Sequence, residues 1–226
     1  MNDLEKQKLL SHSGEFISIG ITEDGNPRGS IAVPWERTAH AFNMKLPNVY
    51  FSRQDFESGE LFSLISKFKV FGCYIFAAIS DYSFLSDFKE IRDVFIADGR
   101  YLTDLSFMAD LDDCGLLYIR GAHISDLAPL TRAPGESSFM YLRCLSFDSC
   151  IIDDISALIG WDHFFSELII READGIHERS RWEGITRTSV FRYFESSSHS
   201  SRQRQLSSED EKTLLEYIEK KMNPKR

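Results

Sequence analysis

The stretch ISDLAPL at residues 124–130 occurs three more times along the chain in altered form. The related stretches are ISDYSFL (79–85), LTDLSFM (102–108) and IDDISAL (152–158). Each reads aliphatic, any residue, Asp, apolar, two residues of any kind, and apolar, and the starts lie 23, 22 and 28 residues apart. A period of this size is typical of repeat architectures, in which each unit is one supersecondary element. The sequence therefore predicts a stack of short repeated units.

A second shared element precedes the last three copies. Its copies are VFIADG (94–99), LYIRGA (117–122) and LSFDSC (145–150), with LIIREA (168–173) and the weaker VYFSRQ (49–54) standing alone. In LYIR, two aliphatic residues alternate with Tyr118 and Arg120, which predicts a strand with one buried face. Each unit is therefore expected to be a short strand, a turn and a helical segment.

The Asp of each copy stands just before two apolar residues spaced three apart, such as Leu127 and Leu130. A side-chain oxygen at this position can accept the first free N–H groups of a helix. The proline of ISDLAPL falls in the first turn, where its missing N–H is tolerated. We therefore predict helix caps at Asp81, Asp104, Asp126 and Asp154. The alternative is a ladder of carboxylates that binds a cation.

The merged unit resembles the leucine-rich repeat, in particular the internalin-like and phosphatase-regulator type that reads L-x-x-L-x-L-x-x-N-x-I-x-D-I-x-x-L. The resemblance covers roughly residues 70 to 175. It implies a short curved α/β solenoid of about five coils that binds another protein without catalysis. One departure concerns the position that usually holds Asn, which is small here: Gly99, Ala122, Cys150 and Ala173. An asparagine ladder is thus absent, and the turns must be satisfied by backbone or water.

The two ends of a repeat stack need caps, since they would otherwise expose apolar faces. We expect four regions: an N-terminal β cap (1–47), the repeats (48–178), a C-terminal cap (179–194) and a Ser-rich linker with an amphipathic helix (195–226). Alternating apolar residues predict a β-hairpin over 16–36, with a separate small β domain as the alternative. The last helix docks either on its own chain or on a partner.

In such a stack, the strand residues that point away from the core line one concave face. The aligned columns are Phe95, Tyr118, Ser146 and Ile169; Ala97, Arg120, Asp148 and Arg171; and Asp98, Gly121, Ser149 and Glu172. Aromatic and arginine side chains bordered by carboxylates are typical of protein-binding patches. We therefore predict partner-binding residues at Phe95, Tyr118, Arg120, Asp148, Ile169, Arg171 and Glu172.

The charge of −9 is unevenly distributed. Residues 76–175 hold 18 acidic and 7 basic side chains, a local net charge of −11. This balance argues against a nucleic-acid surface, because phosphate contacts need clustered Lys and Arg. It motivates a second hypothesis, an acidic inhibitor or immunity-type protein that occludes a basic toxin or enzyme. The sequence leaves the partner and the oligomeric state open.

The chain carries no phosphate-binding loop, dinucleotide fingerprint, H-E-x-x-H or G-x-S-x-G motif. We therefore expect no cofactor and no metal, and keep an enzyme with an unrecognised site as a third hypothesis. The four cysteines form no CxxC pair and are expected to be buried and free. No apolar run approaches the ~18 residues of a membrane span, and the N-terminus lacks the apolar stretch of a leader. A cytoplasmic protein without membrane contact is expected.

Overall fold

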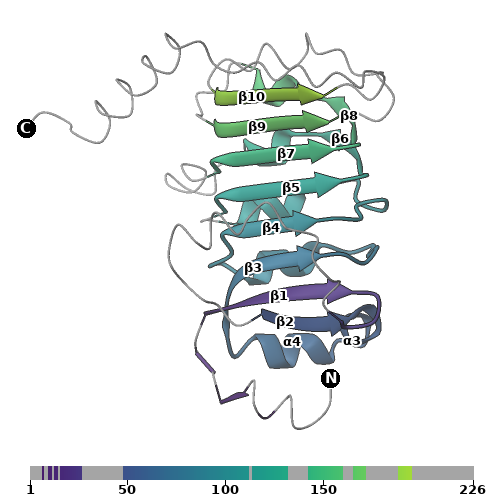
Figure 1. Ribbon diagram of the computed structural model, residues 1–226, viewed down its shortest axis with the longest axis vertical. Coiled ribbons are helices and arrows are strands. Elements are labelled where there is room, and N and C mark those ends of the chain that lie inside the picture. The colour runs from purple at the N-terminus through teal and green to yellow at the C-terminus, as the bar shows by residue number, and fades with distance from the viewer. Residues whose placement is uncertain are drawn as a thin grey trace, which may run out of the picture.

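The computed structural model describes residues 7, 10–11, 13–14, 16–26, 48–111, 114–131, 142–159, 165–171 and 188–194. These residues form an α/β structure with one large parallel sheet and few helices. The eight strands of this sheet follow the order β10-β9-β7-β5-β4-β3-β1-β2, and β6 and β8 form a second, two-stranded sheet (Figure 1). Within the described parts of the chain, no helix is long and apolar enough to cross a membrane.

The strands of the large sheet are β1 (Phe16–Thr22), β2 (Asn48–Ser52), β3 (Lys69–Ile75), β4 (Asp93–Ile96), β5 (Leu116–Arg120), β7 (Cys144–Asp148), β9 (Phe165–Arg171) and β10 (Thr188–Phe194). The small sheet contains β6 (His123–Asp126) and β8 (Ile151–Asp154). The helices are α3 (Arg53–Glu57) and α4 (Glu60–Ile65), followed by the 3-10 turns η1 (Ser83–Asp87), η2 (Ser106–Asp110), η3 (Ala128–Leu130) and η5 (Ser156–Leu158).

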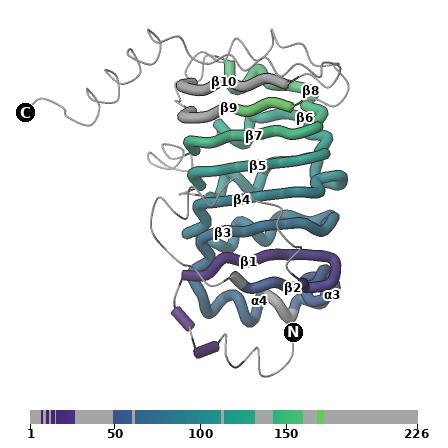
Figure 2. The backbone as a smooth tube through the Cα atoms, viewed as in Figure 1, coloured from purple at the N-terminus to yellow at the C-terminus, as the bar shows by residue number. Residues whose placement is uncertain are grey.

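From β3 onward, each strand of the large sheet pairs in parallel with the next one along the chain. From β3 to β9 the chain returns between neighbouring strands through a 3-10 turn, and the turns between β3 and β7 lie behind the sheet in the view of Figures 1 and 2. Parallel neighbours require such a crossover, because each strand must start at the same edge. The repeated sequence unit thus corresponds to one strand and one return.

Alternate strand residues point to the same side of the sheet and join one core cluster with the 3-10 turns. We call this side the core face; its fully buried strand residues include Ile19, Cys73, Ile96, Ile119 and Phe147. Large rings fill the core near the start of the chain, where Phe56 of α3 packs edge-on against Phe84 of η1 at 4.8 Å. Phenylalanine rings thus fill the space between α3 and η1.

All four predicted capping aspartates accept a backbone N–H from the residue two positions later. The distances from the carboxylate oxygens are 2.8 Å for Asp81, 2.5 Å for Asp104, and 2.7 Å for both Asp126 and Asp154. Each bonded N–H belongs to the first residue of a 3-10 turn, so the Asp lies one residue before the N-cap position. These turns have three to five residues and are shorter than the helices that the pattern suggested. The bond of Asp81 lowers the pKa of its carboxyl.

The turns that lack an asparagine are closed by backbone hydrogen bonds to the neighbouring unit. Gly99 donates its N–H to the carbonyl of Arg120 at 2.8 Å, and Gly121 donates to that of Asp148 at 2.9 Å. A Cβ on Gly99 would lie 3.0 Å from the Arg120 carbonyl oxygen, which explains the small residue there. Gly121 and Ser149 take positive φ values of 71° and 55° at equivalent turn positions. Backbone contacts therefore replace the side-chain ladder.

The N-terminal region differs from the predicted hairpin. Strand β1 lies between β2 and β3 and is parallel to both, so its two edges are already paired over Ser18–Ile21. An antiparallel partner at 31–35, which lies outside the described residues, has no free edge of β1 to pair with there. Strand β1 is thus an inner strand of the large sheet, with only β2 beyond it at that end. At the other end, β10 adds a last parallel strand in the region predicted as a cap.

Candidate functional site

The second side of the large sheet, which we call the opposite face, contains the predicted partner-binding columns. The register pairs Phe95 with Tyr118, Tyr118 with Ser146, and Ser146 with Ile169, so the first column forms one continuous row. In the next row, Arg120 pairs with Asp148 and Asp148 with Arg171. Strand geometry brings these side chains together from segments far apart in the sequence. Glu172 lies outside the described residues.

Phe95 and Tyr118 are not the exposed anchors that the sequence suggested. Only 4% of Phe95 and 8% of Tyr118 is exposed. Their rings stack in parallel with centroids 4.5 Å apart and an interplanar angle of 10°. The two side chains that were predicted to touch a partner therefore pack inside the protein.

Polar contacts hold the row that follows these rings. The hydroxyl of Tyr118 donates to Asp148 Oδ2 at 2.8 Å, and Arg171 Nη1 lies 3.6 Å from the same oxygen. Ser149 donates its hydroxyl to Asp148 Oδ1 at 3.1 Å. Burial raises the pKa of Tyr118, and the neighbouring carboxylate adds to this shift. Asp148 thus accepts two hydrogen bonds and lies beside the Arg171 guanidinium.

The charged residues at the carboxyl ends of the strands remain accessible. Arg120 is exposed, and the Arg171 side chain keeps 46% of its surface. Ile169 is half-buried beside them. These residues occupy neighbouring positions at the ends of β5, β7 and β9, where the Arg171 guanidinium pairs with Asp148 and Arg120 lies next to Asp148 in the register. We call the residues Arg120, Asp148, Ile169 and Arg171 the charged patch.

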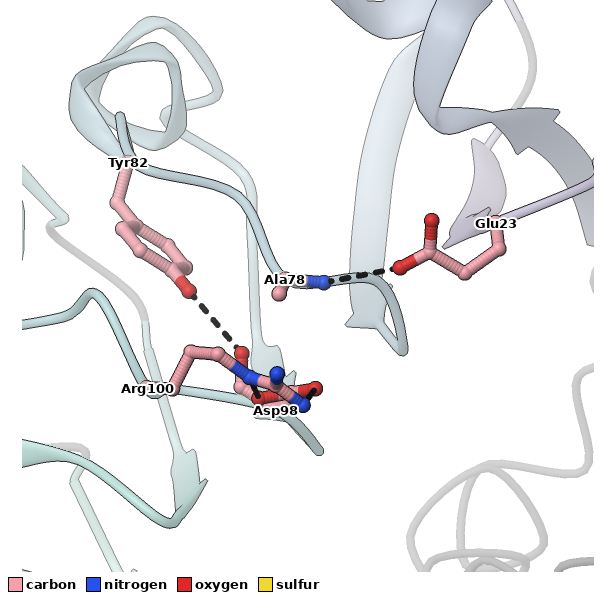
Figure 3. Close-up of polar contacts among 5 residues, drawn as sticks. All are labelled: Glu23, Ala78, Tyr82, Asp98 and Arg100. Atoms are coloured by element: carbon pink, nitrogen blue, oxygen red, sulfur yellow. Dashed lines mark hydrogen bonds and ion pairs between the residues drawn. The ribbon is translucent and has the colours of Figure 1, made fainter.

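A second polar cluster lies at the carboxyl ends of β1, β3 and β4 (Figure 3). Arg100 donates to both carboxylate oxygens of Asp98, from Nε at 2.8 Å and from Nη2 at 2.6 Å. Tyr82 donates its hydroxyl to the Asp98 carbonyl at 3.5 Å, and Glu23 accepts the Ala78 N–H at 3.4 Å. Arg100 lowers the pKa of the Asp98 carboxyl, mainly through these hydrogen bonds. The cluster joins the turns that follow three strands.

Asp93 is a buried carboxylate that the sequence analysis did not identify. It begins β4 on the opposite face, is only 3% exposed, and its Oδ2 has no hydrogen-bond partner. Burial raises the pKa of its carboxyl to about 6. An Asp before a strand looks like an ordinary turn residue, so the sequence carried no signal of its burial.

Other titratable groups of the described residues lie apart from these clusters. Among the described residues, no three His, Cys, Asp or Glu side chains are placed to hold a metal ion. Cys73, Cys114 and Cys150 are buried and free, and burial raises the pKa of Cys114 to about 12 and of Cys150 to about 11. His123 pairs with Asp153 at 3.0 Å, with both side chains 58% exposed.

A groove of about 710 Å3 lies beside α3, α4 and η1. Rings of Phe56, Phe62 and Phe84 line it together with the carboxylates of Glu57 and Asp81. Both of these acids already have partners, since Glu57 accepts from Arg53 at 2.7 Å and Asp81 caps η1. Serine hydroxyls and Asp87 complete the lining of this groove.

No protein family, curated protein or solved structure matches this chain.

Proposed function

We propose that this protein is a non-catalytic binding module of the leucine-rich-repeat type, a short curved solenoid that recognises another protein through the opposite face of its sheet. The observation that carries the proposal is the charged patch. It sets Arg120 and Arg171 on either side of Asp148 at the ends of three paired strands. Arginine can form two parallel hydrogen bonds to a carboxylate and is enriched among residues that dominate binding energies.

Tyr118 supports the patch, since its hydroxyl donates to the carboxylate of Asp148, whose neighbours in the register are the two arginines. A side chain that is fixed before binding loses less conformational entropy in the complex. The partner that fits this arrangement offers acidic groups or backbone carbonyls to the arginines, and apolar surface to Ile169.

The test is affinity capture from the native lysate with the wild type and with the double variant Arg120→Ala, Arg171→Ala. The double variant is expected to lose the captured partner. The matched control is Lys89→Ala with Arg143→Ala, which removes the same charge from two exposed positions away from the patch. If both double variants capture the same proteins as the wild type, the patch is not the binding surface.

A second candidate function rests on a different observation. Asp81, Asp104, Asp126 and Asp154 are all exposed and stand at the same position before each of the described 3-10 turns. This column of carboxylates favours an inhibitor or immunity-type protein for a basic partner, through electrostatic steering. Association that slows steeply as salt is raised, and that Asp104→Asn with Asp126→Asn weakens, would favour this alternative over the charged patch.

A further inference from the structure

The returning segments of the repeats change character beside the first strands of the sheet. Each 3-10 turn from η1 to η5 contacts the next described turn along the chain. The return between β2 and β3 consists instead of the two α-helices α3 and α4, at the β2 end of the sheet (Figure 1). The groove of about 710 Å3 lies where α-helix gives way to the tighter 3-10 turn. Its volume falls within the roughly 300–1,000 Å3 of ligand sites.

Three phenylalanine rings line this groove and pack on one another. The centroids of Phe56, Phe62 and Phe84 lie 4.8, 5.8 and 5.9 Å apart. Phe56 and Phe84 are buried, whereas Phe62 is half-buried. Rings that already hold one another need little ordering when a ligand arrives, and the face of an aromatic ring attracts a cation. Phe62 is therefore the accessible part of a fixed aromatic surface.

Three carboxylates line the same groove, and they come from both of its sides. Glu57 ends α3, Asp81 precedes η1 and Asp87 ends η1. All three residues are exposed. The described residues that line the groove include no Lys or Arg. The groove thus combines an aromatic surface with negative charge.

The contacts of these carboxylates leave them charged and able to accept further hydrogen bonds. Asp81 accepts the Ser83 N–H at 2.8 Å, and this bond lowers the pKa of its carboxyl, so the group stays ionised at neutral pH. Glu57 accepts from Arg53 through one oxygen, in an exposed ion pair of the kind that contributes little. The Asp87 carboxylate forms no hydrogen bond or ion pair within the described part of the chain. Each carboxylate has about four acceptor sites in total.

The acidic character continues beyond the groove. Asp104 and Asp110 flank η2 as Asp81 and Asp87 flank η1, and both are exposed. Charges of one sign along one side of a protein raise the local concentration of an oppositely charged ligand. A ligand of the groove is therefore expected to be basic.

We propose that the groove binds a basic segment of a partner protein, in which the stem of a lysine or arginine packs on Phe62 and its charged group lies among the three carboxylates. Long basic side chains pack their hydrocarbon stems on apolar surface in this way. Nucleic acid does not fit, because the same carboxylates repel phosphate. The groove is formed by the returning segments and the charged patch by the opposite face, so this second site does not depend on the proposed function.

The test is fluorescence anisotropy of the full chain with a labelled peptide in which lysine and arginine alternate with alanine. Ser83→Lys places a cation in the groove and should weaken binding by at least about tenfold, because like charges oppose each other. Ser106→Lys is the matched control, since it adds the same charge to the equivalent first residue of η2, which does not line the groove. It should change the affinity by less than about threefold.

A second pair of variants removes charge without adding any. Asp81→Asn with Asp87→Asn should weaken the peptide by roughly three- to tenfold. Asp104→Asn with Asp110→Asn is its counterpart around η2 and should leave the affinity unchanged. If Ser83→Lys does not fold, as judged by thermal melts, this pair decides. Equal losses in the two members of either comparison would assign binding to the acidic side as a whole and overturn the groove.

Two results with the wild type would also overturn the proposal. One is the absence of any binding of the peptide. The other is its displacement by an equal concentration of spermidine, which would show a site for free polyamines. The Arg120→Ala, Arg171→Ala variant should bind the peptide as the wild type does, so failure here is distinguishable from failure of the capture experiment.

Discussion

Two aspartates project from the same face of the sheet and meet opposite conditions. Asp148 of β7 accepts from Tyr118 and Ser149 and lies near Arg171, whereas Asp93 of β4 is buried with an unpaired oxygen. Their surroundings differ as well. The row of Phe95 and Tyr118 contains stacked, buried rings, whereas the row of Asp148 contains the exposed Arg120 and Arg171. A face with one regular register can therefore be interior at one end and surface at the other. Strand pairing positions the side chains, but their chemistry decides which part can meet a partner.

The largest expected effect comes from removing a ring at the buried end. Phe95→Ala should lower the free energy of unfolding by about 3–5 kcal/mol, because it leaves a cavity under stacked rings. Ile169→Ala, in the half-buried row of the charged patch, should cost no more than about 2 kcal/mol. Urea denaturation of both variants measures the difference. Equal losses would mean that the two ends of the face are packed alike.

The pH dependence of stability should follow Asp93. Its pKa rises from 3.8 to about 6 on folding, so the native state holds the proton more tightly than the unfolded chain does. Its contribution to stability is therefore complete below pH ~4 and is lost as the pH rises to about 6, by roughly 2–3 kcal/mol. Asp93→Asn cannot titrate and should flatten this part of the profile in urea melts between pH 4 and 8. A variant profile parallel to that of the wild type would contradict the burial of this carboxylate.

The sequence allowed the strand columns and the capping aspartates to be predicted, because both follow from short repeated spacings. Phe95 and Tyr118 were placed in the correct row but with the wrong exposure. Their environment depends on what packs over the face, and alternation within a strand contains no information about that. The position of β1 between β2 and β3 could not be predicted for a related reason. It depends on pairing between distant segments, whereas the local pattern of Ile17, Ile19 and Ile21 suits any strand.

A smaller effect is expected at the bond that links the two rows. Tyr118→Phe keeps the stacked ring but removes the hydroxyl that donates to Asp148 at 2.8 Å. The loss should be about 1 kcal/mol in urea denaturation, typical of one hydrogen bond. Tyr101→Phe is the matched control at an exposed ring and should leave the midpoint unchanged. If Tyr118→Phe behaves like the control, the bond does not stabilise Asp148.

The smallest effects test whether the difference between the two ends is confined to the opposite face. Asp81 and Asp154 accept the first N–H of η1 and η5, the first and last of the described 3-10 turns, at 2.8 and 2.7 Å. Asp81→Ala and Asp154→Ala should each cost about 0.5–1 kcal/mol, since each removes one capping acceptor. Asp81→Asn and Asp154→Asn retain an acceptor and should recover most of the loss. Equal losses of stability in thermal or urea melts would show that the aspartate bond stabilises η1 and η5 to the same degree. The motif ISDLAPL would then belong to the scaffold, and the differences that matter for binding would lie on the strands before it.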